Sequence, residues 1–177
     1  GTLLACEQAE IEPDILCLSK GLTGGAIPLA VTMASEPVFE AHRSEDRARM
    51  FFHSSSYTAN PIACAAANAN LAIWRNEPVM KRIANLGEGQ AAQLNALATH
   101  RAVHNPRRNG TITAFEVGEG SGYLSDLAPR MLALFRERNL LLRPLGNTIY
   151  VMPPYCISSE QLDCIYDTIR EVIADVT

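Results

Sequence analysis

The stretch DILCLSKGLTGG, residues 14–25, joins a short apolar run to a glycine-rich turn and carries one lysine between them. Ile15–Leu18 predicts a buried strand, and the glycines predict a turn at the end of that strand. A lysine attacks a carbonyl group only as the neutral amine, and burial at a strand end favours that form. No Asp or Glu lies between Ile15 and Ser35 to pair with Lys20. The residues alone leave two interpretations open: a nucleophilic lysine, or a strand-end lysine that reaches into solvent.

The segments after this turn predict further strands and helices. The expected elements are a strand at residues 29–33, a short helix from residue 36, a helix at residues 62–74 and a longer helix at residues 77–98. Asn60 and Pro61 have the residue types of an N-cap and a first helical position. The N-terminal part of the chain is therefore expected to be mixed α/β.

From residue 109 the pattern changes to a smaller α+β unit. Its expected elements are a strand at residues 111–117, a glycine-rich loop at 118–122, a helix at 125–138, strands at 140–143 and 148–152, and a final helix. Ser158 and Gln161 have the spacing of a capping box ahead of the final helix, and the apolar residues of that helix recur on one face.

The composition narrows the class of partner. The chain has 177 residues, 47% of them hydrophobic, a formal net charge of −4 and no run of Lys or Arg. Because nucleic-acid binding depends on clustered basic residues, we expect a small-molecule partner and no nucleic acid. No apolar run approaches the length of a membrane span, and the first residues, GTLLACEQAE, lack the pattern of a signal peptide. We expect a soluble cytoplasmic protein without membrane contact.

The cysteines support neither a disulfide framework nor a zinc site. The chain has five of them, with no CxxC pair and no histidine at ligand spacing. We expect Cys6, Cys17, Cys64, Cys156 and Cys164 to be small buried thiols, and we expect no metal site.

Three consecutive serines precede the helix that Asn60 opens. Ser54, Ser55 and Ser56 offer hydroxyl donors beside the unpaired N–H groups of a helix N-terminus, where the helix dipole favours an anion. A phosphate group suits such a place. The alternative is an ordinary serine turn that leads into a helix cap and binds nothing.

One arginine follows three leucines in the C-terminal part. Residues 140–143 predict an apolar strand that ends in Arg143, and no acidic residue between Asn139 and Ser159 can pair with it locally. A buried charge needs a partner, and the planar guanidinium group binds a carboxylate through two hydrogen bonds. A substrate carboxylate is one candidate partner, and solvent or a distant Glu is the other.

Three motifs, in this order, resemble one enzyme family. They are EPDILCLSKGLTGG, HSSSYTANPIACAAA and RPLGNTIYVMPPY. The pattern is similar to the class III (subgroup II) aminotransferases of fold type I, over essentially the whole chain. The resemblance implies an α/β fold that is the C-terminal part of a fold type I transferase dependent on pyridoxal 5′-phosphate (PLP). Residues 1–75 would end the large PLP-binding domain, and residues 76–177 would form an inter-domain helix and the small α+β domain.

The resemblance also implies how the chain meets the cofactor. Lys20 would form a Schiff base with PLP and then move a proton between substrate and cofactor. Ser55 and Ser56 would contact the cofactor phosphate of the neighbouring subunit, in a homodimer with shared active sites. The family usually has Gly-Pro-Thr where this chain has three serines, so Ser56 keeps the hydroxyl of the threonine while the stiffness of the proline is lost.

Within the family, the segment RPLGNTIYVMPPY resembles the members that act in biotin synthesis. They transfer an amino group from S-adenosylmethionine to 8-amino-7-oxononanoate. The resemblance implies that Arg143 holds the carboxylate of 8-amino-7-oxononanoate, and that Lys20, Ser54 and Tyr150 lie at the same substrate site. The alternative within the family is an ornithine, acetylornithine, GABA or other ω-amino acid aminotransferase.

One catalytic group is expected to lie outside these residues. PLP catalysis needs an acid beside the pyridine nitrogen. The family carries that acid in a D-E-x-x-T-G-x-G-R-T-G stretch, which ends where Gly1-Thr2-Leu3 begins the present sequence. We therefore expect the chain to be a fragment that is inactive alone. A truncated product without any catalytic role is the alternative of a different class.

Overall fold

The computed structural model describes residues 2–118 and 122–177 and divides into two compact units. The N-terminal unit covers Thr2–Val79, and the C-terminal unit covers Met80–Thr177. Their assignment to the end of a large domain (residues 1–75) and to a small domain (residues 76–177) stays a prediction. Within the described ranges, no helix is long and apolar enough to cross a membrane.

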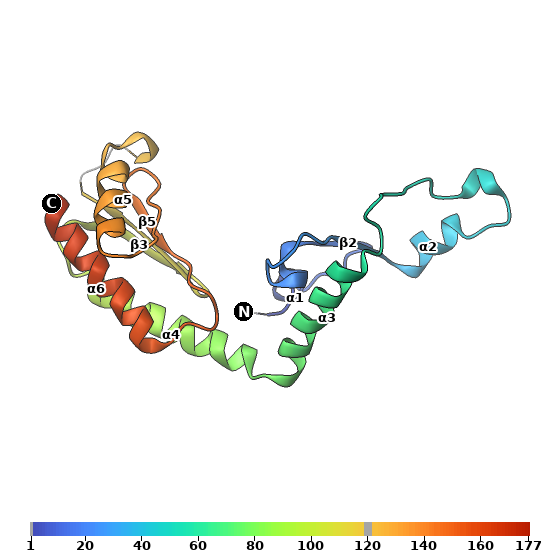
Figure 1. Ribbon diagram of the computed structural model, residues 1–177, viewed down its shortest axis with the longest axis horizontal. Coiled ribbons are helices and arrows are strands. Elements are labelled where there is room, and N and C mark those ends of the chain that lie inside the picture. The colour runs from blue at the N-terminus through green and yellow to red at the C-terminus, as the bar shows by residue number, and fades with distance from the viewer. Residues whose placement is uncertain (1, 119–121) are drawn as a thin grey trace. The chain divides into compact units, whose positions relative to one another are not determined.

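The N-terminal unit pairs a small antiparallel sheet with one long helix and several short helical segments (Figure 1). Its elements are α1 (Ala5–Ala9), β1 (Ile15–Leu18), the 3₁₀ turn η1 (Lys20–Thr23), β2 (Val31–Ala34), α2 (Glu36–His42), the 3₁₀ turn η2 (Arg47–Arg49) and α3 (Pro61–Asn76). Ile15 pairs with Ala34 and Leu18 pairs with Val31. The strand at residues 15–18 is confirmed, and so is the N-cap of α3, where Asn60 Oδ1 accepts a hydrogen bond from the N–H of Ile62 at 3.0 Å.

The N-terminal unit has little buried core of its own. Its buried side chains in the described range are Thr23, Ala63, Ala67 and Val79. Its exposed large apolar side chains are Leu3, Ile11, Ile15, Val31, Met33, Phe39, Met50, Phe51, Phe52, Tyr57, Ile62 and Ile73. The prediction that residues 15–18 are buried is wrong for this chain, since Ile15 is 55% exposed. A two-stranded sheet stays open unless a further layer packs against it.

The C-terminal unit is a three-stranded antiparallel sheet with helices packed against it (Figure 1). Its elements are α4 (Val79–Leu97), β3 (Val103–Asn109), β4 (Ile112–Val117), the 3₁₀ turn η3 (Gly122–Leu124), α5 (Leu127–Glu137), β5 (Thr148–Val151) and α6 (Ser159–Val176). The strand order is β3-β4-β5. The capping box of Ser158 and Gln161 is confirmed at the start of α6. The predicted glycine-rich loop at residues 118–122 lies partly outside the described residues.

Strand β3 was not expected from the sequence. It reads VHNPRRN, and Val103 is its one buried residue. A strand with so few apolar side chains gives no alternating pattern to recognise. Asn105 has a φ of 48°, and the pairing with β4 shifts register between His104 and Arg107, where Pro106 has no N–H to donate.

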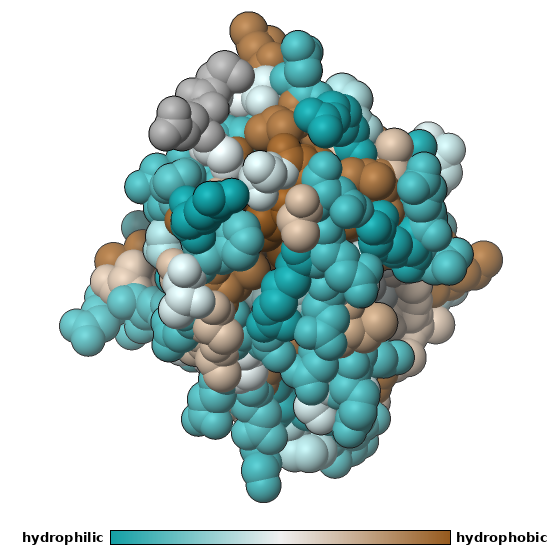
Figure 2. All heavy atoms as spheres, turned by 90° about the vertical axis from the view of Figure 1, so that its left-hand side faces the viewer, coloured by the Kyte–Doolittle hydropathy of each residue, from teal (hydrophilic) through white to brown (hydrophobic). Residues whose placement is uncertain are grey.

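One face of this sheet carries the core of the C-terminal unit. The sheet contributes Thr113, Phe115 and Val117 from β4, and Ile149 and Val151 from β5. The helices contribute Leu86, Leu94 and Leu97 from α4, Met131 and Phe135 from α5, and Leu162, Tyr166, Ile169, Val172 and Ile173 from α6. Figure 2 views the left-hand side of Figure 1, where the C-terminal unit is drawn, and shows a largely hydrophilic surface with hydrophobic residues visible between the polar ones.

A closed polar network lies inside this core. The side-chain amide of Gln90 donates to the carbonyls of Thr111 at 3.0 Å and Val151 at 3.3 Å. Its oxygen accepts hydrogen bonds from the hydroxyls of Thr113, at 3.2 Å, and Tyr166. The Thr113 and Tyr166 hydroxyls also lie 2.7 Å apart. Gln90, Thr113 and Tyr166 are fully buried, and within the described chain no buried side-chain polar atom lacks a partner.

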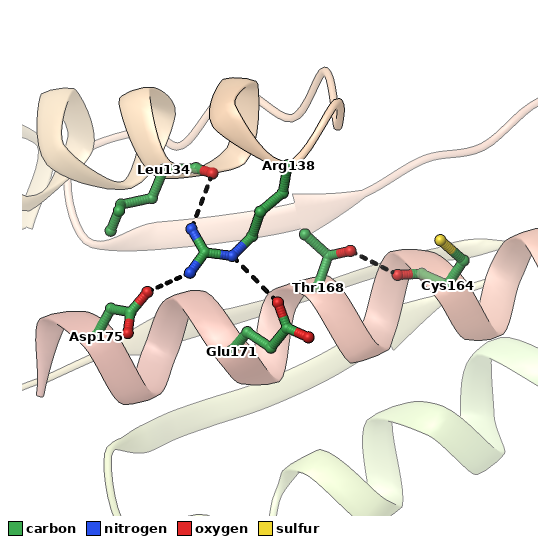
Figure 3. Close-up of polar contacts among 6 residues, drawn as sticks. All are labelled: Leu134, Arg138, Cys164, Thr168, Glu171 and Asp175. Atoms are coloured by element: carbon green, nitrogen blue, oxygen red, sulfur yellow. Dashed lines mark hydrogen bonds and ion pairs between the residues drawn. The ribbon is translucent and has the colours of Figure 1, made fainter.

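Arg138 fastens the end of α5 to α6 (Figure 3). Its guanidinium group donates to Glu171 Oε2 at 3.1 Å and to Asp175 Oδ2 at 2.5 Å on α6. It also donates to the carbonyl of Leu134 at 3.2 Å, which accepts a second hydrogen bond from the N–H of Arg138 at 3.3 Å. The segment that carries Arg143 starts from this anchored helix end.

The cysteines are more exposed than predicted. Cys17, Cys156 and Cys164 are exposed, Cys6 and Cys64 are partly buried, and all five are free thiols. Cys17 lies in the uncovered β1–β2 sheet. Cys156 lies in the loop between β5 and α6, and Cys164 lies on the exposed side of α6. The prediction of buried thiols is therefore wrong. No cluster of three or more metal-ligating side chains occurs in the part of the chain that the structure describes.

Candidate functional site

Lys20 begins the 3₁₀ turn η1 directly after β1. The N–H of Leu22 donates to the carbonyl of Ser19 at 2.8 Å, and the N–H of Gly25 donates to the carbonyl of Lys20 at 3.2 Å. Gly24 and Gly25 have φ values of 62° and 86°, in the left-handed region that favours glycine. The glycines thus close a tight turn onto the backbone of the lysine, in agreement with the turn predicted from the sequence.

Asn70 of α3 holds this turn from outside it. Its side-chain amide donates to the carbonyl of Gly21 at 2.8 Å and to that of Leu22 at 3.0 Å. A Cβ atom at Gly24 would lie 3.3 Å from Asn70 Oδ1, so the turn and the helix are in close contact. Asn70 was not among the residues predicted from the sequence. The one signal it offered is a polar residue in an alanine-rich helix.

The side chain of Lys20 is exposed. No ion pair joins it to any carboxylate of residues 2–118 and 122–177. The burial expected at this strand end is therefore not provided by the present chain, because the sheet that precedes Lys20 is itself uncovered. What the chain does provide is an amine on a fixed backbone, available to a ligand.

Ser55 shapes the turn that leads into α3. Its hydroxyl accepts a hydrogen bond from the N–H of Tyr57 at 3.3 Å, and its carbonyl accepts one from the N–H of Thr58 at 3.0 Å. This is the serine turn considered as the alternative to an anion site. Ser54 and Ser56 are exposed, and their hydroxyls have no partner among the described residues, so both can still donate to a ligand. The roles of Ser54, Ser55 and Ser56 stay predictions.

The strand predicted at residues 140–143 is absent, and this prediction is wrong. The structure has no regular element there and only an isolated bridge between Leu145 and Thr148, just before β5. Asn139 has a φ of 58°, which turns the chain out of α5, and Pro144 has no N–H for a sheet ladder. Leu141, in the middle of the leucine run, is 85% exposed.

Arg143 is exposed rather than buried, which corrects the expectation of a buried charge. None of the described carboxylates forms an ion pair with it. Its backbone is nevertheless held in place, because Leu145 and Thr148 exchange hydrogen bonds of 2.8 and 3.0 Å and the carbonyl of Asn147 accepts one from the N–H of Val117 at 2.8 Å. Arg143 is thus an unpaired guanidinium on an anchored loop.

Tyr150 lies in β5, opposite Ala114 of β4. It is partly buried and sits between the fully buried Ile149 and Val151, so its side chain leaves the sheet on the face away from the core. Tyr150 is two residues after Thr148, and Arg143 is two residues before Leu145. Both residues thus lie two positions outside the Leu145–Thr148 bridge, on either side of one chain reversal.

The structure divides the candidate residues between the two units. Lys20 and Ser54–Ser56 belong to the N-terminal unit, where Asn70 links the lysine turn to the helix that follows the serines. Arg143 and Tyr150 belong to the C-terminal unit. Each unit gives its candidate residues a defined local geometry, and their roles toward a cofactor and a substrate stay predictions.

Known proteins match the chain along its whole length. The model of the class-III aminotransferase family matches residues 1–173. A curated adenosylmethionine-8-amino-7-oxononanoate aminotransferase from Synechococcus elongatus is 40% identical over 177 residues, which are 99% of this chain and 41% of the relative. A relative of the same name from Helicobacter pylori is 38% identical and covers 92% of this chain and 38% of its own length. The chain thus spans about two fifths of these relatives.

Solved structures agree with this assignment. The adenosylmethionine-8-amino-7-oxononanoate aminotransferase of Methanocaldococcus jannaschii superposes with a TM-score of 0.83 at 29% identity, covering 96% of this chain and 40% of its own. An (S)-enantioselective omega-transaminase from Thermomicrobium roseum gives a TM-score of 0.86 at 29% identity, covering 99% of this chain and 40% of its own. The predicted α/β fold, part of a transaminase fold, is confirmed, and the chain belongs to the class-III aminotransferase family.

Proposed function

We propose that this chain carries the catalytic lysine and a substrate-carboxylate clamp of a PLP-dependent aminotransferase in biotin synthesis. That enzyme would transfer an amino group from S-adenosylmethionine to 8-amino-7-oxononanoate. The observation that carries the proposal is the Lys20 turn, which presents an exposed amine on a backbone held by glycines and by Asn70. The curated relatives are named for these two substrates, which supports the choice.

The residues present fit PLP in two respects. Lys20 offers an amine without a competing ion pair among the described residues, and Ser55 and Ser56 offer hydroxyls that can donate to a phosphate, since the Ser55 hydroxyl only accepts a hydrogen bond and the Ser56 hydroxyl has no described partner. When bound, PLP supplies an aldehyde that reacts with amines and a ring that withdraws electrons from the substrate. Lys20 would hold the cofactor first and would then, once released, move a proton to and from the substrate's α-carbon. Ser55 and Ser56 would donate to the phosphate in the neighbouring subunit of a homodimer.

Arg143 would bind the substrate carboxylate. It is an exposed guanidinium on an anchored loop, and its planar fork can donate two parallel hydrogen bonds to a carboxylate. Tyr150 follows the same chain reversal, two residues after Thr148, and its hydroxyl would contact the same substrate. Ser54 completes this predicted substrate set together with Lys20.

The acid for the pyridine nitrogen would come from outside these residues. The chain spans about two fifths of its curated relatives, and the β1–β2 sheet before Lys20 is uncovered. We infer that the remaining part of the enzyme supplies both the acid and the cover over Lys20, and that the 177-residue chain is inactive alone. A cytoplasmic location stays a prediction.

The chain offers an internal control for the test of Lys20, because it contains just two lysines, Lys20 and Lys81. Both are exposed. The full-length protein would be incubated with PLP, reduced with borohydride and digested, and the adduct would be located by mass spectrometry. We expect the adduct on Lys20, its loss in Lys20→Ala, and no change in Lys81→Ala. An adduct shared equally by both lysines would overturn the proposal.

Substrate choice is tested at Arg143. We expect Arg143→Ala to raise KM for 8-amino-7-oxononanoate about 10- to 100-fold, the loss that one charge-assisted hydrogen-bonded pair represents, while KM for S-adenosylmethionine changes little. Arg143→Lys should recover part of the loss. Faster turnover of ornithine or another ω-amino acid by the unmodified enzyme would favour the other branch of the family.

A further inference from the structure

We infer that Asn70 is a positioning residue for Lys20. The inference rests on the proposed function of Lys20, but the contact that carries it lies wholly within the described residues of this chain. Asn70 is partly buried in α3, and its amide nitrogen donates to two consecutive carbonyls, those of Gly21 and Leu22, at 2.8 and 3.0 Å. These are the two residues that follow Lys20 in η1.

The orientation of the Asn70 amide follows from its partners. Both partners are carbonyl oxygens, which only accept hydrogen bonds, so the nitrogen of the amide must face them and the oxygen must face away. The oxygen then lies toward Gly24, where a Cβ atom would approach it to 3.3 Å. Asn70 therefore lies against the turn at Gly21, Leu22 and Gly24, and the glycine at residue 24 makes room for it.

The two hydrogen bonds add to the few that the turn makes itself, among them one from the N–H of Gly24 to the carbonyl of Gly21 at 3.3 Å. Four residues, Lys20–Thr23, form η1, and a short 3₁₀ turn has weaker hydrogen bonds than an α-helix. Thr23 fixes the far end, since it is buried and its hydroxyl donates to the carbonyl of Ile27 at 2.6 Å. Asn70 fixes the near end, next to the lysine. Without it, the carbonyl of Leu22 would turn toward water, the carbonyl of Gly21 would keep only its hydrogen bond from the N–H of Gly24, and the backbone after Lys20 would be held less firmly.

The hydrogen bonds from Asn70 affect where the amine of Lys20 can be placed. A catalytic group contributes most when the protein holds it in reacting geometry before the substrate arrives. Asn70 touches neither substrate nor cofactor in this proposal. It keeps the backbone of Lys20 in the conformation from which the side chain reaches the cofactor's aldehyde.

Asn68 provides a matched control for the test. It is also an asparagine of α3, it is exposed, and its side chain has no partner in the described parts of the chain. Asn70→Ala removes the donor, and Asn70→Asp keeps the shape but places an acceptor against the two carbonyls. These two variants and the control Asn68→Ala would be made in the full-length holoenzyme, with far-UV circular dichroism as the check on folding.

The first readout is the rate at which PLP, added to the apoenzyme, becomes trapped on Lys20 by borohydride. We expect Asn70→Ala and Asn70→Asp to slow trapping roughly 5- to 100-fold, as the loss of two hydrogen bonds would do, and Asn68→Ala to leave it unchanged. In turnover, kcat should fall while KM for the amino acceptor stays the same. Trapping at the parent rate in Asn70→Ala, or full rescue by Asn70→Asp, would overturn the inference.

The second readout is amide hydrogen exchange in residues 20–25, which needs no bound cofactor. We expect faster exchange there in both Asn70 variants and unchanged exchange in Asn68→Ala. Equal protection from exchange in all variants would show that Asn70 does not hold the turn, even if a variant were inactive for other reasons. If the parent enzyme traps PLP on Lys81 or on no lysine, the proposed function fails, while the exchange result still decides whether Asn70 holds the turn.

Discussion

Replacing Gln90 should destabilise the C-terminal unit far more than removing the hydroxyl of Tyr166. Gln90→Met conserves the length of the side chain and takes the donor away from two carbonyls, those of Thr111 and Val151. A buried polar group left unpaired costs about 1–3 kcal/mol, so the two together should cost about 2–6 kcal/mol of the unfolding free energy. That is a large part of the roughly 5–15 kcal/mol that holds a typical domain folded.

Tyr166→Phe is the matched control in the same network. The Gln90 oxygen keeps its hydrogen bond from Thr113, at 3.2 Å, and its amide nitrogen keeps both carbonyls. No buried group is orphaned, so we expect the loss of one hydrogen bond, about 0.5–1.5 kcal/mol.

The assay is urea unfolding followed with two probes. Four of the five tyrosines lie in the C-terminal unit, while Trp74, the one tryptophan, lies in the N-terminal unit. Near-UV circular dichroism of tyrosine should show the shift in Gln90→Met, and Trp74 fluorescence should not. Equal losses of stability in Gln90→Met and Tyr166→Phe would refute the hydrogen-bond argument.

Three further predictions concern the same unit. Gly87→Ala should stabilise α4 by about 0.5–1 kcal/mol because its Cβ would meet nothing closer than 3.5 Å, whereas Gly89→Ala should gain nothing because its Cβ would lie 3.0 Å from Leu162 Cδ2; thermal unfolding showing the reverse order would contradict this. Burial raises the pKa of Tyr166, so the folded state keeps a proton that the unfolded chain loses above pH ~10, and the unfolding free energy should fall as the pH rises past that value. Tyrosinate absorbance against pH measures this, and the fall should lessen in Tyr166→Phe. Arg138→Met should lower the free energy of urea unfolding by about 1–2 kcal/mol, because the Arg138 side chain is only 27% exposed and its guanidinium group donates to α6 at two places; a change below 0.5 kcal/mol would show that these ion pairs contribute no more than ordinary surface pairs.

Features with a local cause could be predicted from the sequence. The N-cap at Asn60 depends on one side chain and an N–H group two residues away, and the capping box at Ser158 and Gln161 depends on a spacing of three. The turn after β1 depends on glycines that tolerate positive φ. All of these interactions lie within a few residues, so the sequence pattern contains the information they need.

Burial and long-range contacts could not be predicted in this way. Ile15 and Cys17 have the composition of a buried strand, but burial requires a covering layer that the described N-terminal unit lacks. The strand expected at Arg143 needed a partner, and the residues around Pro144 offer no ladder to one. The two partners of Asn70 lie 48 and 49 residues earlier, a distance at which no local pattern signals contact.

The two units hold their candidate residues by different means, which bears on how the activity should be tested. Lys20 stands in a unit with few buried side chains, so its geometry depends on hydrogen bonds from Asn70 and on the turn glycines. Arg143 stands beside a sheet whose inner face is fully packed, so its loop is held by a core. Hydrogen bonds exposed to water open more readily than a packed core. Under mild denaturing conditions, the turn that carries Lys20 should therefore open before the loop that carries Arg143. The first partly unfolded form should still bind the substrate carboxylate but should no longer trap PLP.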